Sequence, residues 1–509
     1  KEGAGYFSMF CVVYDTDLSR LESTCNRLLT DARAKNARFI VESQFARFAS
    51  FLSSLPGHSG LSTQRLLNYR RARIINANFA DFAMVHKDDE GDPEGPIVFE
   101  TPEGGIFRVD LFSPRSTSHN AYFAGTTGGG KSYTMNHILA NALTKRPILY
   151  ILDIGNSYDP LIQSYPGAVK ITVDFTNPDL RLNPFSFAET PNQSERVSLS
   201  HLLEHMITGG QVQLTQGDRV DLMDALDRLF EAYDPADPPT LLDYYKMLES
   251  IDPGLAKPLR LWIPGGPYQA FFNSKTDSFQ GADLVYFELT GFDDHPDVAS
   301  AITFLLFTKI FQRLQRPQDR GRNKIIVLDE CWKFLMNDVM ASKITELYRT
   351  VRKHAGAIHT ITQHPNDLIN SKHRDAILAN TAFTFMLEQK GVGEEAREAF
   401  ALNPREFFVM KTIRLKTGQY AELLIKGPYK RQVRVRVDPF SHALFSTDPA
   451  DRDMRWTLAE LLGSVEAAVR AMADGSARKL IEAARRYPSV QEAARALRDG
   501  NTNELEQIP

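Results

Sequence analysis

The sequence carries Gly125-Thr126-Thr127-Gly128-Gly129-Gly130-Lys131-Ser132, which matches the phosphate-loop pattern G-x-x-x-x-G-K-[ST] at every fixed position. The octapeptide lies between an apolar stretch at 120–124 and a helix-like run at 133–143. Glycines let the backbone curl so that its N–H groups point at phosphate oxygens, and the next helix adds the positive end of its dipole. This setting predicts that all eight residues bind a nucleoside triphosphate. A glycine-rich turn with a chance lysine is the alternative.

Two side chains of the loop have their own predicted roles. Lys131 is expected to reach the β- and γ-phosphates, and Ser132 to supply its hydroxyl to Mg²⁺. We therefore expect ATP and Mg²⁺ as cofactors, and we count Lys131 among the catalytic residues as well.

A pair of acids follows a short apolar run far downstream. Residues 324–330 read Lys-Ile-Ile-Val-Leu-Asp-Glu, which is typical of a buried parallel strand whose carboxyl end faces a ligand crevice. We expect Asp329 to hold Mg²⁺, directly or through water, and Glu330 to activate the water that attacks the γ-phosphate. Two adjacent carboxylates can divide these roles because successive residues leaving a strand point in different directions. A solvated strand end is the alternative.

Three further polar residues complete the predicted catalytic set. Gln363 ends the next strand-like run, where its amide can bond both a phosphate oxygen and the attacking water. Arg349 and Arg352 are three apart and share a helix face, from which a guanidinium could reach the γ-phosphate of a neighbouring subunit as an arginine finger. A polar turn and an ordinary basic helix face are the respective alternatives.

Bulk properties limit the class of protein. At 509 residues the chain exceeds what one hydrophobic core usually supports, so two to three domains are expected. Its 43% hydrophobic and 24% charged content is that of a soluble globular protein. The formal charge of −4 gives no global polyanion-binding signature, so contact with nucleic acid would have to be local.

Cysteine usage and hydropathy indicate the compartment. Cys11, Cys25 and Cys331 lack metal-ligand spacing, which argues against a disulfide framework and a zinc site and favours a reducing cytosol. No apolar run reaches the roughly 18 to 20 residues that span a bilayer, and 301–311 is expected to be a buried helix. The chain begins at Lys1 without a methionine, so we expect it to be the remainder of a longer protein. The sequence does not decide whether that protein carries a targeting or membrane-binding segment.

The pattern of elements predicts an α/β fold in three parts. These are an αβ module at 1–95, a P-loop domain at 96–450 with an all-α insertion at about 189–278, and a helical segment at 451–509. Apolar strands separated by helical patterns predict a mostly parallel sheet covered on both faces. Strand-like runs at 407–414 and 419–425 predict a hairpin that adds antiparallel strands at a sheet edge. The parallel strands are expected at 148–153, 169–175, 284–289, 325–328, 357–362 and 383–387.

Several motifs in a fixed order resemble a known family. They are the phosphate loop at 125–132, Arg-Leu-Asn-Pro-Phe at 181–185, Val-Leu-Asp-Glu-Cys-Trp-Lys at 327–333, the basic segment at 349–353 and Ile-Thr-Gln at 361–363. Together they resemble the conjugation and type IV secretion ATPases of the VirB-four, TraC and TrbE type, within the FtsK–HerA superfamily of P-loop motors. The resemblance is specific because Asp-Glu-x-Trp-Lys and Leu-Asn-Pro-Phe go beyond generic P-loop chemistry.

The resemblance covers about residues 95–430 and implies a RecA-like P-loop fold. Residues 1–90 resemble the carboxyl-terminal part of the family's amino-terminal domain. The implied function is an ATPase that drives pilus assembly and substrate transfer, located in the cytoplasm at the periphery of the bacterial inner membrane. Its implied partners are further copies of itself, as a hexamer or as dimers, together with inner-membrane components and other ATPases of a secretion complex.

A DNA translocase of the HerA or FtsK kind, or a coupling protein that pumps DNA, is the rival reading. A strongly basic pore stripe would favour it, but the basic clusters at 70–73, 349–354 and 372–374 are short. We therefore expect any nucleic-acid binding to be weak. A non-enzymatic nucleotide-binding scaffold is disfavoured because Lys131 and Glu330 are both present.

Overall fold

The computed structural model divides the chain into two compact units, Lys1–Asp88 and Asp89–Pro509. The residues that it describes are 3–7, 11–34, 37, 39–42, 47–48, 51, 72–75, 89–173, 179–210, 212–272, 274–291, 296–330, 338–389, 391, 393–485, 487 and 489–498.

The smaller unit contains one described helix and one strand pair. Helix α1 (Leu18–Ala34) follows a cap in which Asp17 accepts hydrogen bonds from the Arg20 N–H and the Ser19 hydroxyl. Strands β1 (Ala4–Phe7) and β2 (Ala72–Ile75) pair antiparallel. This is the αβ composition expected for the start of the chain.

The larger unit is built on a twelve-stranded sheet. Its strands lie in the order β4-β3-β14-β13-β11-β5-β10-β9-β6-β8-β7, and β12 pairs with β13. From β11 to β7 every pairing is parallel, and the pairings from β11 to β4 are antiparallel. The bounds are β3 Ile97–Glu100, β4 Ile106–Val109, β5 Asn120–Ala124, β6 Ile148–Asp153, β7 Val169–Thr172, β8 Leu284–Glu288, β9 Lys324–Leu328, β10 Gly356–Thr362, β11 Thr381–Met386, β12 Leu415–Lys416, β13 Tyr420–Lys426 and β14 Lys430–Arg436.

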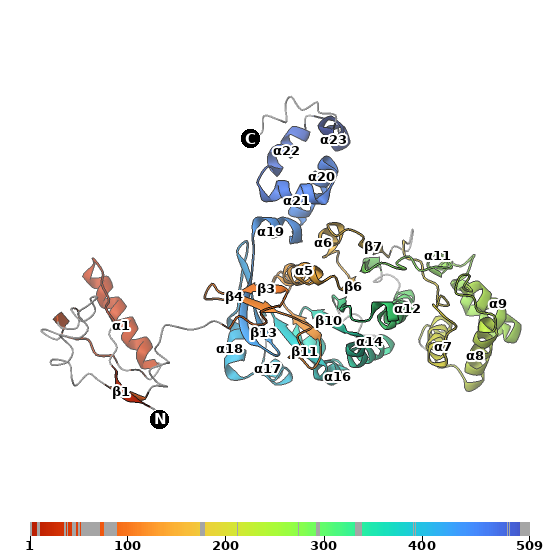
Figure 1. Ribbon diagram of the computed structural model, residues 1–509, viewed down its shortest axis with the longest axis horizontal. Helices are drawn as coiled ribbons and strands as arrows, with labels where there is room; N and C mark the ends of the chain where they lie inside the picture. Colours follow the sequence, from red (N-terminus) through yellow and green to blue (C-terminus); the bar gives the residue numbers. More distant parts are fainter. Residues whose placement is uncertain are drawn as a thin grey trace. The chain divides into compact units, whose positions relative to one another are not determined.

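Helices cover both faces of the parallel strands, as the continuous apolar runs predicted. Side chains alternate between the faces, so Tyr150 and Leu152 of β6 belong to one core cluster while Leu149 and Ile151 belong to another. Helices α12 and α14 cover the first face and α5, α6 and α19 the second (Figure 1). Their bounds are α5 Lys131–Ala142, α6 Asp159–Gln163, α12 Pro296–Gln315, α14 Asp338–Thr350 and α19 Pro439–Phe445.

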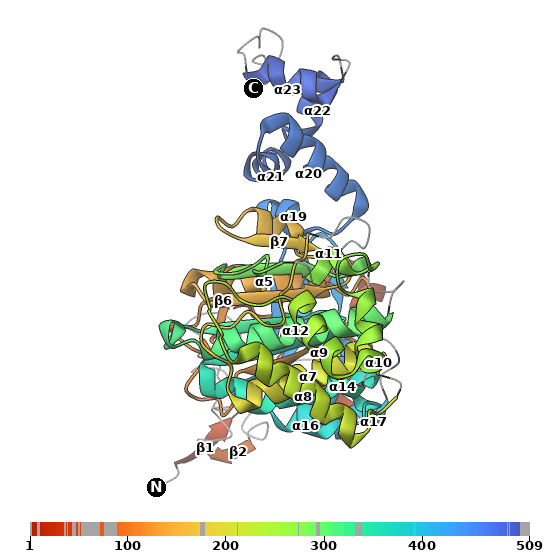
Figure 2. The same cartoon turned by 90° about the vertical axis from the view of Figure 1, so that its right-hand side faces the viewer.

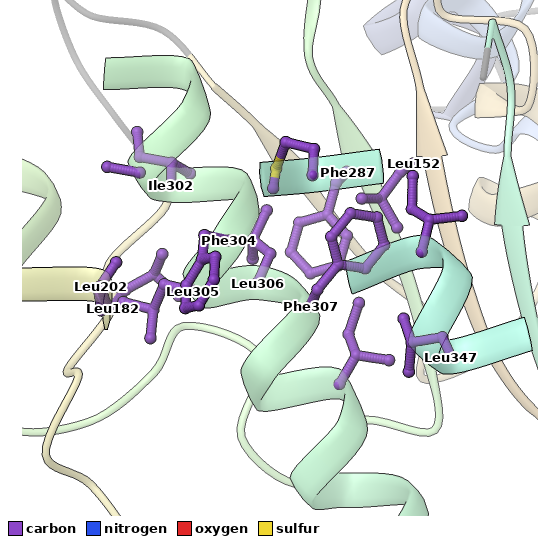
Figure 3. Close-up of a cluster of buried hydrophobic side chains, with 14 of the residues drawn as sticks. Leu152, Leu182, Leu202, Phe287, Ile302, Phe304, Leu305, Leu306, Phe307 and Leu347 are labelled. Carbon is purple, nitrogen blue, oxygen red and sulfur yellow. The ribbon is translucent and has the colours of Figure 1, made fainter. Parts of the chain in front are cut away.

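The expected all-α insertion lies between β7 and β8. Figure 2 shows its helices α7, α8 and α9 side by side, and α7 and α8 begin with capping boxes at Asn192–Glu195 and Thr215–Asp218. Leu202 of α7 and Leu182, which precedes the insertion, lie in one cluster with Phe304 and Leu305 of α12 (Figure 3). The insertion helices are α7 Gln193–Thr208, α8 Gln216–Phe230, α9 Leu241–Ile251, α10 Pro253–Ala256 and α11 Gln269–Phe272.

The predicted hairpin is wrong in its first strand. Residues 404–412 form helix α18 (Pro404–Thr412), because Asn403 and Glu406 make a reciprocal capping box and Pro404 occupies the first helical turn. The antiparallel part of the sheet is made instead by β13 and β14 together with β3 and β4, and β12 adds only a short pairing, Leu415 with Ala421. The Asn-Pro-x-Glu signal outweighs the strand-like side chains that follow it.

The remaining helices flank the sheet and end the chain. Helices α20–α23 follow α19 and share a small core of their own, which includes Leu458, Leu461 and Ala468. Helix α21 also contributes Val469 to the core beneath α5 and α19. Their bounds are α15 Pro365–Ile369, α16 Arg374–Ala379, α17 Glu394–Ala399, α20 Pro449–Leu462, α21 Val465–Ala473, α22 Ala477–Ala484 and α23 Val490–Arg498.

A buried histidine in the central strand predicts acid sensitivity. The His359 ring is fully buried against Phe123, neither of its nitrogens has a hydrogen-bond partner among the described residues, and burial lowers its pKa to about 3. Because this folded-state pKa lies below the ordinary 6.5, the stability contributed by the neutral ring is complete above pH 6.5 and is lost as the pH falls toward 3.

We expect His359→Leu to remove this pH dependence. Between pH 6.5 and about pH 4.5 the wild-type larger unit should lose about 2–3 kcal/mol more unfolding free energy than the variant. Urea unfolding at both pH values measures the difference, and His201→Gln, at an exposed histidine, is the control. Equal acid destabilisation in wild type and His359→Leu would contradict the prediction.

Candidate nucleotide site

The phosphate loop joins β5 to α5 in a conformation that glycine permits. Gly128 and Gly130 have φ of 75° and 84°, in the left-handed region that favours glycine. The Gly125 N–H donates to the Thr362 carbonyl at 3.3 Å, and the Thr126 N–H donates to the Glu388 carbonyl at 3.1 Å. Both neighbouring strands, β10 and β11, therefore fix the base of the loop.

The first turn of α5 is open to an anion. Gly130 is the N-cap, and no side chain caps the helix within the part of the chain that the structure describes. The backbone N–H groups at this end carry the positive end of the helix dipole. The N-terminal N–H groups of α5 and the cation Lys131 therefore lie together at this end of the loop.

A chain of polar contacts links the loop to two neighbouring strand ends. The Lys131 Nζ lies 3.6 Å from the Glu330 Oε1, and the Gln363 Nε2 donates to the same oxygen at 2.9 Å. The Thr127 hydroxyl donates to the Gln363 Oε1 at 2.9 Å. The structure thus brings together Lys131, Glu330 and Gln363, which are separated by up to 232 residues in the sequence (363 − 131).

Glu330 follows β9 with a strained backbone. Its φ of 53° lies in the left-handed region, which costs about 1–3 kcal/mol for a residue other than glycine. This conformation turns Glu330 toward the loop directly after Asp329. The residues that follow, Cys331, Trp332 and Lys333 of the Asp-Glu-x-Trp-Lys motif, lie outside the described residues.

Asp329 and Asp153 lie side by side at the carboxyl ends of β9 and β6. The register pairs Leu152 with Leu328, and the Asp329 N–H donates to the Leu152 carbonyl at 2.9 Å. The side chains of both acids are almost fully buried. Burial raises the pKa of both, and the charge of Asp329 raises that of Asp153 further, whereas Lys131 and a hydrogen bond from Tyr158 oppose the rise at Asp329.

Sequence reasoning missed Asp153 and Tyr158. The predicted strand at 148–153 ends in an acid as the Asp329 strand does, so the rule that carboxyl ends of parallel strands meet at one edge could have found Asp153. Tyr158 carries no such signal because its contact depends on how the loop after β6 folds back. Its hydroxyl donates to the Asp329 Oδ2 at 2.6 Å.

These groups border a cavity of about 540 Å³. The phosphate loop, Asp329, Glu330 and Gln363 line one side, and Asp153 and Ser157 lie beside them. The other side comes from the turn before β13, including Thr417 and Gly418, and from the turn between α19 and α20 (446–448). The sequence did not predict this second wall.

A buried arginine fixes the second wall. Arg455 of α20 is 3% exposed, and its guanidinium donates to the carbonyls of Ala443, Leu444 and Ser446. Next to these carbonyls, Phe445 packs edge to face on Tyr133 of α5, with ring centroids 5.7 Å apart. The α19–α20 turn is therefore held against the first turn of the phosphate-loop helix.

The two predicted arginine fingers lie elsewhere. Arg349 lies in the last turn of α14 and Arg352 lies in the turn Val351–His354, and both side chains are exposed. Neither is among the described residues that line the 540 Å³ cavity. The structure therefore does not bring them to the site of their own chain.

Two kinds of feature are absent from the described residues. In the ranges that the structure describes, no group of three or more His, Cys, Asp or Glu side chains could hold a metal ion. Over the same residues, none of the helices has the length and hydropathy needed to cross a bilayer.

Comparison with known proteins agrees with the motifs. A model of the TraG P-loop domain matches residues 106–250 and 254–476. Protein TraC of Escherichia coli is 27% identical over 455 residues, which are 82% of this chain and 50% of TraC. The type IV secretion system protein virB4 of Bartonella henselae is 23% identical over 398 residues, 74% of this chain and 49% of that protein. The chain thus spans about half the length of these relatives.

A solved structure supports the fold. The structure of VirB4 of Thermoanaerobacter pseudethanolicus superposes with a TM-score of 0.57 at 19% identity, over 70% of this chain and 100% of that one. The match confirms the expected P-loop fold with its large mixed sheet. Because the TraG P-loop model covers well over half of the residues, the chain belongs to the TraG P-loop domain family, in the VirB-four and TraC group that its motifs indicated.

Proposed function

We propose that this chain is the ATP-hydrolysing domain of a motor in a type IV secretion or conjugation system, where it powers pilus biogenesis and substrate translocation. The observation that carries the proposal is the contact chain from Lys131 through Glu330 to Gln363, which places a cation, a carboxylate and an amide around the phosphate loop. The names of the related proteins supply the biological setting.

The proposed reaction is attack of water on the γ-phosphate of ATP, which breaks the bond to the β–γ bridging oxygen and gives ADP and phosphate. The loop N–H groups and Lys131 bind the β- and γ-phosphates and offset the charge that develops on them. Glu330, released from Lys131 by the arriving phosphate, accepts a proton from the attacking water. Gln363, hydrogen-bonded to both Glu330 and Thr127, orients that water and couples the loop to β10.

The residues fit a magnesium ion. Ser132 and Asp329 both line the cavity, and a hydroxyl with a carboxylate is the hard oxygen set that Mg²⁺ takes up beside phosphates. When bound, Mg²⁺ would neutralise charge on the β- and γ-phosphate oxygens. Ser132 and Asp329 would hold it, directly or through water.

The exposed arginines suggest how copies of the chain cooperate. Arg349 or Arg352 would enter the site of a neighbouring copy in a hexamer or a dimer and stabilise charge on its γ-phosphate. The assembly would work in the cytoplasm and associate peripherally with the inner membrane through membrane components and other ATPases of the secretion complex.

Lys131→Ala and Glu330→Gln should separate binding from hydrolysis. Loss of Lys131 removes the cation at the phosphates, so ATP affinity should fall at least about 10-fold. Glu330→Gln keeps the shape of the site but lacks the base, so turnover should fall about 10²–10⁴-fold while ATP still binds. Calorimetry measures the ATP affinity, and phosphate release measures the turnover. The control is Lys145→Ala, at an exposed lysine in the turn that follows α5. Equal loss of affinity in both variants would refute this division of roles.

The trans role of the arginines can be tested by mixing inactive variants. Each variant alone should be inactive. Mixing Arg349→Ala or Arg352→Ala protein with Lys131→Ala protein should restore part of the ATPase activity, because some interfaces then pair an intact site with an intact finger. Lys353→Ala, at the exposed neighbouring cation, should remain active on its own. Absence of rescue at every mixing ratio, with assembly shown by light scattering, would count against the trans role.

DNA should bind weakly and should not drive the motor. A chain with a net charge of −4 can contact phosphates only locally, so any DNA binding should fall steeply between about 50 and 200 mM salt. ATP turnover near physiological salt should respond to oligomerisation more than to added single-stranded or duplex DNA. Strong stimulation by DNA, with directional displacement of a labelled strand, would favour a translocase instead.

A further inference from the structure

Two buried tyrosines lie behind the carboxylates of the cavity. The rings of Tyr158 and Tyr286 pack edge to face with centroids 6.0 Å apart, and both side chains are fully buried. Each hydroxyl donates to one acid: Tyr158 to the Asp329 Oδ2 at 2.6 Å, and Tyr286 to the Asp153 Oδ2 at 2.9 Å. The pair therefore offers two chemically alike hydroxyls that differ in the carboxylate they bind.

The contacts of Asp329 fix the plane of its carboxylate. One oxygen accepts the Tyr158 hydroxyl, and the other accepts the Glu330 backbone N–H at 2.9 Å. Neither donor is a mobile surface group, because one is a buried ring and the other is backbone. Rotation of the carboxylate would break at least one of these bonds and leave a buried polar group unsatisfied.

The backbone that carries Tyr158 is itself anchored at several points. The preceding Ser157 donates its N–H to Asp153 at 2.7 Å, and its carbonyl accepts the Asn136 Nδ2 of α5 at 3.0 Å. The following Asp159 pairs with Lys170 of β7 at 2.8 Å. The position of Tyr158 therefore depends on α5, β6 and β7, and its hydrogen bond makes the position of the Asp329 carboxylate depend on them as well.

Asp153 makes a different use of its carboxylate. A single oxygen, Oδ2, accepts both the Ser157 N–H and the Tyr286 hydroxyl. The Ser157 bond closes the loop that begins at Asp153, so this acid braces the backbone on which Tyr158 lies, whereas the Tyr286 hydroxyl comes from β8 and takes no part in closing the loop. Asp329, by contrast, has each of its oxygens oriented by a separate donor at the edge of the cavity that also holds Ser132.

We propose that Tyr158 is a positioning residue for the magnesium site: its hydroxyl holds the Asp329 carboxylate in the orientation that receives the ion, while Tyr286 has no such role. The inference rests on the proposed function, since it needs a metal-bound nucleotide at this site. Groups that orient a metal ligand from behind typically change metal affinity by about 10–100-fold when they are removed.

The test measures metal binding rather than activity. Mn²⁺ serves as the probe, and electron paramagnetic resonance counts free Mn²⁺ over the full chain saturated with ADP. Tyr158→Phe should weaken Mn²⁺ affinity about 10-fold or more and leave ADP binding in EDTA unchanged. The matched control is Tyr286→Phe, which removes an equally buried hydroxyl from the same tyrosine pair and should keep the wild-type Mn²⁺ affinity.

Near-isosteric replacements test the donor itself. Tyr158→p-aminophenylalanine keeps an N–H donor and should retain Mn²⁺ affinity, whereas Tyr158→p-fluorophenylalanine lacks a donor and should lose it. If Tyr158→Phe no longer binds ADP in EDTA, the comparison of the amino and fluoro replacements takes the place of that variant as the test. A purely structural role for the ring would make the two replacements behave alike.

The outcomes separate the inference from the function on which it rests. Wild-type Mn²⁺ affinity in Tyr158→Phe, an equal loss in Tyr286→Phe, or equal affinities for the amino and fluoro replacements would overturn the role of Tyr158 alone. A wild-type protein that binds ADP but takes up no Mn²⁺ with it would instead overturn the magnesium site of the proposed function.

Discussion

The hydrogen-bond ladder of β10 is the constraint on which the site depends. This strand pairs in parallel with β5 on one side and with β9 on the other, so it sets the spacing between the phosphate loop and the acids that follow β9. Its own carboxyl end then places Gln363 between Thr127 and Glu330. Register leaves little freedom here, because a slip of one residue would send each side chain to the opposite face of the sheet.

The burial of two adjacent carboxylates costs free energy in this arrangement. Asp153 and Asp329 are nearly inaccessible and adjacent, which disfavours two ionised carboxylates unless hydrogen bonds and cations compensate. The chain supplies Lys131 on one side and two tyrosine hydroxyls on the other. Such an environment favours a ligand that brings further positive charge, and it holds the oxygens in place before that ligand arrives.

Local patterns predicted the parts of the site that rest on short motifs. The phosphate loop, Asp329, Glu330 and Gln363 each end or follow a recognisable apolar strand, so their meeting at one sheet edge was foreseeable. Tyr158, Arg455 and the wall at 446–448 depend on packing between distant segments, which no local pattern encodes. The strand assigned to 407–414 failed for a local reason, since the Asn403–Glu406 capping box specifies a helix.

The same alternation that builds two core faces also ties the insertion to the site. Leu152 belongs to the same core cluster as residues of α12, Leu202 of the insertion and Leu182, which precedes the insertion (Figure 3), while the next residue, Asp153, lines the cavity. The packing surface and the carboxylate are therefore consecutive residues of one strand. Because close-packed cores transmit displacement, any movement of the insertion that shifts β6 must also move Asp153, its loop and Tyr158 relative to Asp329.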